Sequence, residues 1–234
     1  VKPHPSFLYP QPKQNPPDFY HSPLTSLVCA ENTTNKGGGA CWNFSELVRI
    51  KEVCEKHGLA YHLDGARIWN AMVERGESAK QYGELFDTIS VCLSKGLGCP
   101  VGSVLVGDKE KMDEALRIRK ILGGGMRQAG FMAAAGIYAL DNQIDRLAND
   151  HKKAKEIGAI LQSLSFIKKV EPLETNIIIF EINEDYLSAD DFIEKLRKKD
   201  IHIIGMGSSK LRIVTHMDYT DQMHETFIKT IKKL

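Results

Sequence analysis

Two short apolar segments, each followed by a chemically reactive residue, constrain the fold of this chain more than any other feature. Residues 59–64 (LAYHLD) read as a buried strand that ends at Asp64. Residues 88–93 (TISVCL) read as a second buried strand, with Lys95 in the turn beyond it. Side chains alternate along a strand, so His62 and Asp64 share one face. Since open α/β sheets bind ligands beyond the carboxyl ends of their strands, Asp64 and Lys95 are expected at a ligand site.

A lysine and a carboxylate in these positions are the pair that pyridoxal 5'-phosphate (PLP) requires. The lysine amine forms a Schiff base with the cofactor aldehyde, and a carboxylate opposite the pyridine nitrogen keeps that nitrogen protonated. Gly96 and Gly98 beside Lys95 let the backbone approach a ligand closely. Each motif alone also fits a structural role, because Asp-Gly is common in turns and helix caps and Ser-Lys-Gly in surface turns. Together the two motifs favour a cofactor site.

Four segments carry a resemblance to a known family: residues 29–35 (CAENTTN), 61–67 (YHLDGAR), 90–106 and 123–130 (GGGMRQAG). They resemble the low-specificity L-threonine aldolases, and the resemblance runs from about Asp18 to the C-terminus. It implies the fold of fold type I PLP-dependent enzymes and the cleavage of L-threonine or L-allo-threonine to glycine and acetaldehyde. A related β-eliminating lyase, or an aldolase for another 3-hydroxy amino acid, is the alternative among enzymes.

The resemblance assigns cofactor-binding roles to four residues. Lys95 would carry the cofactor as the catalytic lysine, and Asp64 would face the pyridine nitrogen. Arg67 would reach the phenolic oxygen of the cofactor and the carboxylate region of the substrate. Arg127 follows three glycines at the mouth of a predicted helix and would bind the phosphate, since a helix N-terminus and a guanidinium both favour an anion.

Three further residues complete the predicted site. Arg212 lies on an alternating strand and would bind the substrate carboxylate in a bidentate pair, although a solvent-facing edge residue fits the alternation equally well. Lys120 belongs to the same resemblance as a substrate contact. His21 matches a family histidine near the substrate hydroxyl and would take its proton as a second catalytic residue. Thr34 stands where many family members have histidine, a departure that bears on diastereomer preference.

Family members also carry an N-terminal segment with a phosphate-cradling turn and a histidine stacked on the pyridine ring. Residues 1–17 do not match it. The chain is therefore expected to be either a fragment or a product that lacks part of the cofactor pocket. The corresponding alternative outside enzymes is an inactive remnant or a partner subunit. Because fold type I sites are completed by a neighbouring subunit, the resemblance implies a homodimer or homotetramer.

Composition limits the other classes of protein. The 234 residues, 42% hydrophobic and 26% charged, suit an ordinary globular chain of one or two domains. A formal net charge of +1 without a basic stripe gives no case for nucleic acid. No apolar run has the length of a membrane span, and no signal-peptide pattern opens the chain. Five cysteines without Cys-x-x-Cys spacing predict a reduced, cytoplasmic protein without a metal site. The small-molecule substrate, a 3-hydroxy amino acid, is what the resemblance implies.

Proline content and hydrophobic periodicity predict the organisation. Residues 1–24 form a Pro-rich arm, since the first 23 residues hold seven of the nine prolines. Residues 25–140 form a partial PLP-binding domain, and residues 141–234 a connecting helix and a small C-terminal α+β domain. Strands alternate with helices in the larger domain, which predicts an α/β fold with a mainly parallel sheet and helices on both faces. The predicted strands are 25–29, 59–63, 88–93, 102–106, 176–182, 201–204 and 210–214; the predicted helices are 43–57, 66–74, 108–121, an interrupted stretch over 126–164, 188–199 and one from 220 onward.

Overall fold

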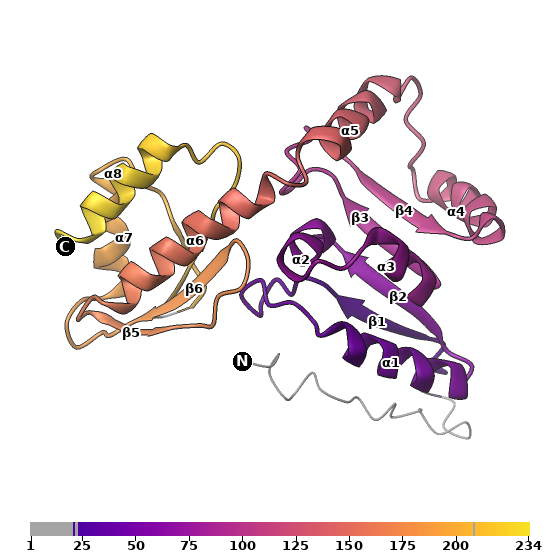
Figure 1. Ribbon diagram of the computed structural model, residues 1–234, viewed down its shortest axis with the longest axis horizontal. Helices are drawn as coiled ribbons and strands as arrows, with labels where there is room; N and C mark the ends of the chain where they lie inside the picture. Colours follow the sequence, from indigo (N-terminus) through magenta and orange to yellow (C-terminus); the bar gives the residue numbers. More distant parts are fainter. Residues whose placement is uncertain (1–20, 22, 208) are drawn as a thin grey trace. The chain divides into compact units, whose positions relative to one another are not determined.

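The computed structural model describes residues 21, 23–207 and 209–234, which form two compact units (Figure 1). Unit 1 holds the described residues up to Thr33 together with Cys41–Ile144. Unit 2 holds Thr34–Ala40 and Asp145–Leu234. A short segment from the first half of the chain thus belongs to the second unit. The predicted Pro-rich arm lies almost wholly outside the described residues.

The described part of unit 1 is built on a four-stranded sheet in the order β1 (Leu27–Glu31), β2 (Ala60–Gly65), β3 (Thr88–Cys92) and β4 (Ser103–Gly107). The first three strands are parallel, and β4 runs antiparallel to β3. In the register, Asp64 lies between Glu31 on one side and Ser90 on the other. The predicted α/β class with a mainly parallel sheet is therefore confirmed.

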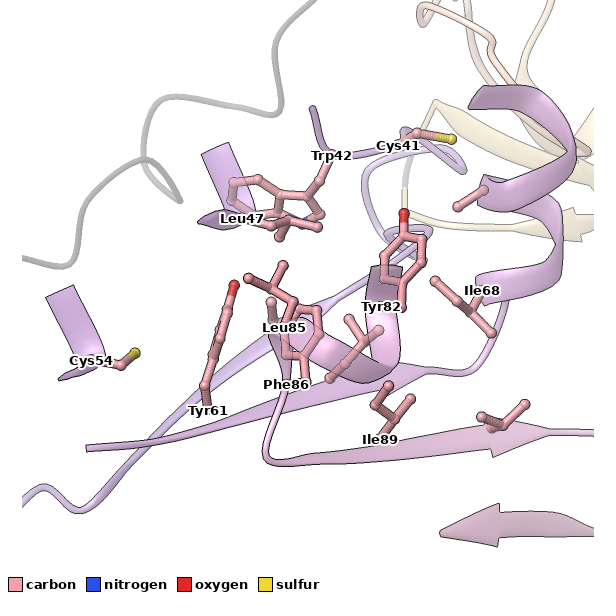
Figure 2. Packing of buried hydrophobic residues seen from close by; sticks show 14 of the residues in the cluster. Cys41, Trp42, Leu47, Cys54, Tyr61, Ile68, Tyr82, Leu85, Phe86 and Ile89 are labelled. Carbon is pink, nitrogen blue, oxygen red and sulfur yellow. The ribbon is translucent and has the colours of Figure 1, made fainter. Parts of the chain in front are cut away.

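Three helices pack on one face of this sheet: α1 (Phe44–Lys56), α2 (Ile68–Arg75) and α3 (Ala79–Leu85). Apolar side chains at alternate positions of the strands, such as Leu63 and Ile89, meet the apolar sides of these helices. Figure 2 shows the aromatic centre of this core, where Phe86 has its ring centroid 4.2 Å from that of Tyr61 and 6.4 Å from that of Tyr82.

The opposite face of the sheet is polar at its centre. It carries the alternate strand residues Cys29, Glu31, His62, Asp64, Thr88 and Ser90. The His62 Nδ1 atom lies 2.8 Å from the Thr88 hydroxyl. At the β4 edge, Met112 of α4 (Lys109–Ile121) lies against this face, because a Cβ added at Gly107 would meet the Met112 side chain at 3.0 Å. The last helix of unit 1 is α5 (Gly130–Asn142).

Unit 2 packs three helices against one face of an antiparallel sheet. Its elements are α6 (Leu147–Gln162), β5 (Ile167–Val170), β6 (Ile177–Ile182), α7 (Ala189–Arg197), β7 (Ile204–Gly205), β8 (Lys210–Val214) and α8 (Asp221–Ile231), with strand order β5-β6-β8-β7. The core lies between the helices and the sheet face that presents Ile178, Phe180 and Leu211. Ile177 and Ile179 point to the other face, yet they are only 0% and 6% exposed.

Local capping chemistry fixes where several helices begin. Among the described residues, five helices start after a residue whose side chain accepts a backbone N–H of the first turn: Asn43, Ser78, Asp108, Ser188 and Thr220. At α3 the arrangement is a full capping box, since the Gln81 side chain also accepts the Ser78 backbone N–H.

Three predicted or omitted elements differ from the structure. The helix α3 and the strand β5 were not predicted, because α3 is seven residues long and contains Gly83, and β5 has two lysines among four residues. The strand predicted at 201–204 is wrong for residues 201–203, which follow α7 without strand geometry. The interruption predicted in the helical stretch over 126–164 is confirmed, since the stretch contains two helices, α5 and α6.

Candidate functional site

Asp64 is held at the carboxyl end of β2 by backbone contacts. Its Oδ1 atom accepts the Ala66 N–H at 3.0 Å, and its carbonyl accepts the Asn32 N–H at 3.0 Å. Only glycine fits at the next position, because a Cβ on Gly65 would lie 2.7 Å from the Ser90 carbonyl oxygen. The backbone at Gly65 therefore packs directly against β3. The hydrogen bonds of Asp64 fix the orientation of its carboxylate at the carboxyl end of the strand.

Lys95 lies in the loop that connects β3 to β4. The Gly98 N–H donates to the Lys95 carbonyl at 2.9 Å, and Gly98 has a φ of 72° that favours glycine. Leu97 is 2% exposed and anchors the loop, whereas Lys95 is exposed. Lys95 therefore lies just beyond the carboxyl end of β3, the strand that pairs with β2 at Asp64.

Arg67 adds a cation close to Asp64 in sequence and in the fold. It occupies the N-cap position of α2, and its side chain makes no capping bond there. The side chain is half-buried. Unit 1 therefore brings Asp64, Arg67 and Lys95 to the carboxyl ends of the neighbouring parallel strands β2 and β3.

The N-terminus of α5 provides a site suited to an anion. Ala129 is its N-cap and has no side chain that can accept the first N–H groups. Arg127 precedes it and is exposed. The helix packs beside the Lys95 loop, because the Cys99 thiol donates to the Ala135 carbonyl at 3.6 Å. Lys120 is exposed in the last turn of α4.

Asn32 supports the site and had no functional role in the sequence analysis. Its side chain is fully buried, accepts the Trp42 N–H at 3.3 Å and donates to the Tyr82 hydroxyl at 3.1 Å. Burial, and then the charge of Glu77, raises the pKa of Tyr82 above its ordinary value, so the hydroxyl keeps its proton. Asn32 therefore fixes the chain that leaves β1 beside Asp64. No local pattern could reveal this bond, since its partners are 50 residues apart.

Arg212 lies in unit 2, on β8. It stands opposite Ile179 in the register and faces away from the helices, whereas Leu211 faces the core. Its Nε atom is buried and has no hydrogen-bond partner among the described residues. The alternation predicted for this strand is present.

His21 lies before the amino end of β1, whereas Asp64 adjoins the carboxyl end of that strand. The catalytic role of His21 stays a prediction. In the described part of the chain, no cluster of His, Cys, Asp or Glu is arranged to bind a metal, and no helix has the length and apolarity needed to cross a membrane.

The architecture matches that of fold type I PLP-dependent enzymes. The solved structure of a threonine aldolase from Leishmania major aligns with a TM-score of 0.73 at 20% sequence identity, over 91% of this chain and 62% of that chain. By sequence, residues 13–185 match the family described as beta-eliminating lyases, and the chain belongs to that family.

Curated relatives are more similar in sequence than the solved structure. Low-specificity L-threonine aldolase 1 of Arabidopsis thaliana is 39% identical over 204 residues, which is 86% of this chain and 56% of the relative. The low specificity L-threonine aldolase of Escherichia coli K12 is 39% identical over 202 residues, 86% of this chain and 58% of the relative. The chain thus spans a little over half the length of these relatives.

Proposed function

We propose that this chain carries the site of a PLP-dependent aldolase that cleaves a 3-hydroxy amino acid, with L-threonine or L-allo-threonine giving glycine and acetaldehyde. One observation carries the proposal. Asp64 and Lys95, 31 positions apart, lie at the carboxyl ends of two adjacent parallel strands in a chain of the beta-eliminating lyase family. The names of the curated relatives support the choice of threonine over other amino acids.

The residues present fit the cofactor in the chemistry of their donor set. Lys95 offers an exposed primary amine for the aldehyde, and Asp64 offers a carboxylate, with a fixed orientation, for a protonated ring nitrogen. Arg127 and the N–H groups at the start of α5 suit the phosphate dianion. Arg67 suits the phenolic oxygen. When bound, PLP supplies an electron sink for the pair released at the substrate Cα.

The remaining groups bind and orient the amino acid. Arg212 offers a planar guanidinium for the substrate carboxylate, and Lys120 offers a second cation. Cleavage requires the β-hydroxyl to lose its proton as the Cα–Cβ bond breaks, and Cα to gain a proton as glycine forms. His21 stays the sequence-based candidate for the group that takes the hydroxyl proton. Asp64 would keep the pyridine nitrogen of the cofactor protonated. A protonated ring would lower the free-energy cost of holding the electron pair released from the Cα–Cβ bond.

Chemical labelling tests the role of Lys95. The chain is mixed with PLP, reduced with borohydride and digested, and the pyridoxyl group is located by mass spectrometry. We expect the label on Lys95 in the wild type and its loss in Lys95→Ala, with Lys80→Ala as a matched exposed-lysine control. Label on a different lysine in a chain that binds PLP would overturn the assignment.

Asp64→Asn tests the electron-sink role separately from binding. The variant retains the side-chain shape and should still permit labelling of Lys95. Threonine cleavage, followed by reduction of the released acetaldehyde, should fall roughly 10²-fold or more, because one charged stabilising group is lost. Unchanged turnover would remove Asp64 from the chemistry. Comparison of threonine with phenylserine separates a threonine aldolase from one for other 3-hydroxy amino acids.

We also propose that the chain self-associates through α5. This helix is apolar on all sides, yet within its unit only Gly136 and Ala139 are buried. Phe131 is 84% exposed and Tyr138 is 62% exposed. A helix that is apolar on all sides is normally buried on all sides. A second copy of this chain would cover the exposed side of α5, which carries Phe131 and Tyr138.

Sedimentation at micromolar concentration tests this association. We expect a dimer or tetramer for the wild type and a smaller species for Phe131→Asp, with Tyr186→Asp, at a residue 70% exposed outside the helix, as a control. A wild-type monomer would contradict the proposal.

A further inference from the structure

The segment Thr34–Ala40 forms a closed glycine loop within unit 2. The Thr34 N–H donates to the Ala40 carbonyl at 3.0 Å, and the Gly39 N–H donates to the Thr34 carbonyl at 2.8 Å. Gly38 and Gly39 have φ values of 72° and 74°, a region that disfavours other residues. We call this segment the glycine loop.

The glycine loop lies on the face of the small sheet that points away from the helices. A Cβ added at Gly39 would lie 3.3 Å from the Ile177 Cβ atom, and one at Gly38 would lie 3.7 Å from the Ile179 Cδ1 atom. These contacts account for the burial of both isoleucines on the face that no helix of unit 2 covers. Arg212 lies on this same face, directly opposite Ile179 in the register.

One side-chain hydrogen bond attaches the glycine loop to the sheet. The Thr175 hydroxyl, at the entry to β6, donates to the Gly39 carbonyl at 2.7 Å. Thr175 is fully buried, so the bond is shielded from water. The Gly39 backbone and the Thr175 side chain are in close contact, since a Cβ added at Gly39 would lie 2.4 Å from the Thr175 Oγ1 atom.

We propose that Thr175 is a positioning residue for the substrate-carboxylate site. Its hydroxyl holds the glycine loop against the sheet, and the loop limits how much water reaches the Arg212 guanidinium. The Arg212 Nε atom is already buried, and a carboxylate gains more from a guanidinium that water screens less. The proposal that Thr175 acts on substrate binding rests on the proposed function; its effect on Arg212 does not.

Reactivity of Arg212 toward phenylglyoxal tests the positioning role in the full chain without cofactor or substrate. The rate of modification at Arg212 is measured by peptide mapping. We expect Thr175→Val to raise the modification rate at Arg212 about fivefold. Loss of one hydrogen bond increases the population in which the glycine loop is detached from the sheet by about this factor. Thr175→Ser keeps the hydroxyl and should restore the wild-type rate. Thr226→Val, which removes an exposed hydroxyl-to-carbonyl bond on α8, is the matched control and should have no effect.

Gly38→Ala provides an independent test should Thr175→Val fail to fold. Its methyl group has room beside Ile179, but its positive φ strains the glycine loop, so Arg212 should again react faster. An Arg212 rate that is the same in the wild type and in the folded loop variants would overturn the proposal.

Steady-state kinetics with threonine then tests the link to substrate. We expect Thr175→Val to raise KM about fivefold with kcat within twofold of the wild type, and Thr175→Ser to restore KM. A fall in kcat with KM unchanged would overturn a carboxylate-positioning role. If the wild type does not cleave threonine, the proposed function fails, and the phenylglyoxal rates still decide whether Thr175 controls access to Arg212.

Discussion

Two tyrosines in the buried cluster of unit 1 differ in whether the hydroxyl has a partner. The Tyr82 hydroxyl accepts a hydrogen bond from Asn32 at 3.1 Å and donates to the Glu77 carboxylate at 3.5 Å. The Tyr61 hydroxyl is buried and has no hydrogen-bond partner among the described residues. Both rings contact the same Phe86 side chain. The pair therefore allows the hydrogen bond to be separated from the packing of the ring.

We expect Tyr82→Phe to lower the free energy of unfolding of unit 1 by about 1–3 kcal/mol. Asn32 is 0% exposed, so its side-chain N–H would lose its partner with no access to water. Tyr61→Phe removes a hydroxyl that gains nothing from burial, and it should leave stability unchanged or raise it by up to about 1 kcal/mol. For a chain of this size, each kcal/mol corresponds to about 2–4 °C in Tm.

Tryptophan fluorescence during urea unfolding is the suitable assay, because the two tryptophans of the chain, Trp42 and Trp69, both lie in unit 1. The denaturant midpoint should fall in Tyr82→Phe and not in Tyr61→Phe, with the slope unchanged. Tyr186→Phe, at a residue 70% exposed in unit 2, is the control. Equal destabilisation by the two buried substitutions would refute the reasoning from hydrogen-bond satisfaction.

Two further predictions concern unit 1. Burial opposes ionisation of Asp87, but the Tyr61 N–H at 2.7 Å and a nearby lysine outweigh it and hold the pKa of Asp87 below its ordinary 3.8. The stabilisation from the Asp87 carboxylate is therefore present above pH 3.8 and is lost as the pH falls through its lower folded-state pKa. In fluorescence-monitored unfolding, Asp87→Asn should be less stable than the wild type at pH 7. Below about pH 4 the variant should lose less free energy of unfolding than the wild type does. Gly65→Ala should cost about 1–3 kcal/mol in urea unfolding, since its Cβ would lie 2.7 Å from the Ser90 carbonyl oxygen, whereas Gly83→Ala, with open space on α3, should gain about 0.5–1 kcal/mol; equal effects would contradict the steric argument.

Local patterns were sufficient to predict the parts of the fold that position Asp64 and Lys95. Asp64 lies near the end of one apolar strand and Lys95 just after another, and parallel strands bring their carboxyl ends to the same side of the sheet. The sequence could not predict features that depend on distant partners. Asn32 is held by Tyr82, and the glycine loop is held by Thr175, 136 positions from its acceptor. Such pairings leave no periodic signal, since neither partner differs locally from an ordinary loop residue.

The placement of Thr34–Ala40 in unit 2 also determines an order of events during folding. This segment leaves the ribosome before Thr175 and Ile177, on which it packs and which follow about 140 residues later. Closing so long a stretch of chain is costly in entropy and is slow unless intervening structure brings the ends closer. The described strands and helices of unit 1 all precede Ile144, so they are synthesised before β6. The glycine loop cannot dock until β6 has formed. The connection between β1 and α1 of unit 1 therefore reaches its final structure only when unit 2 assembles.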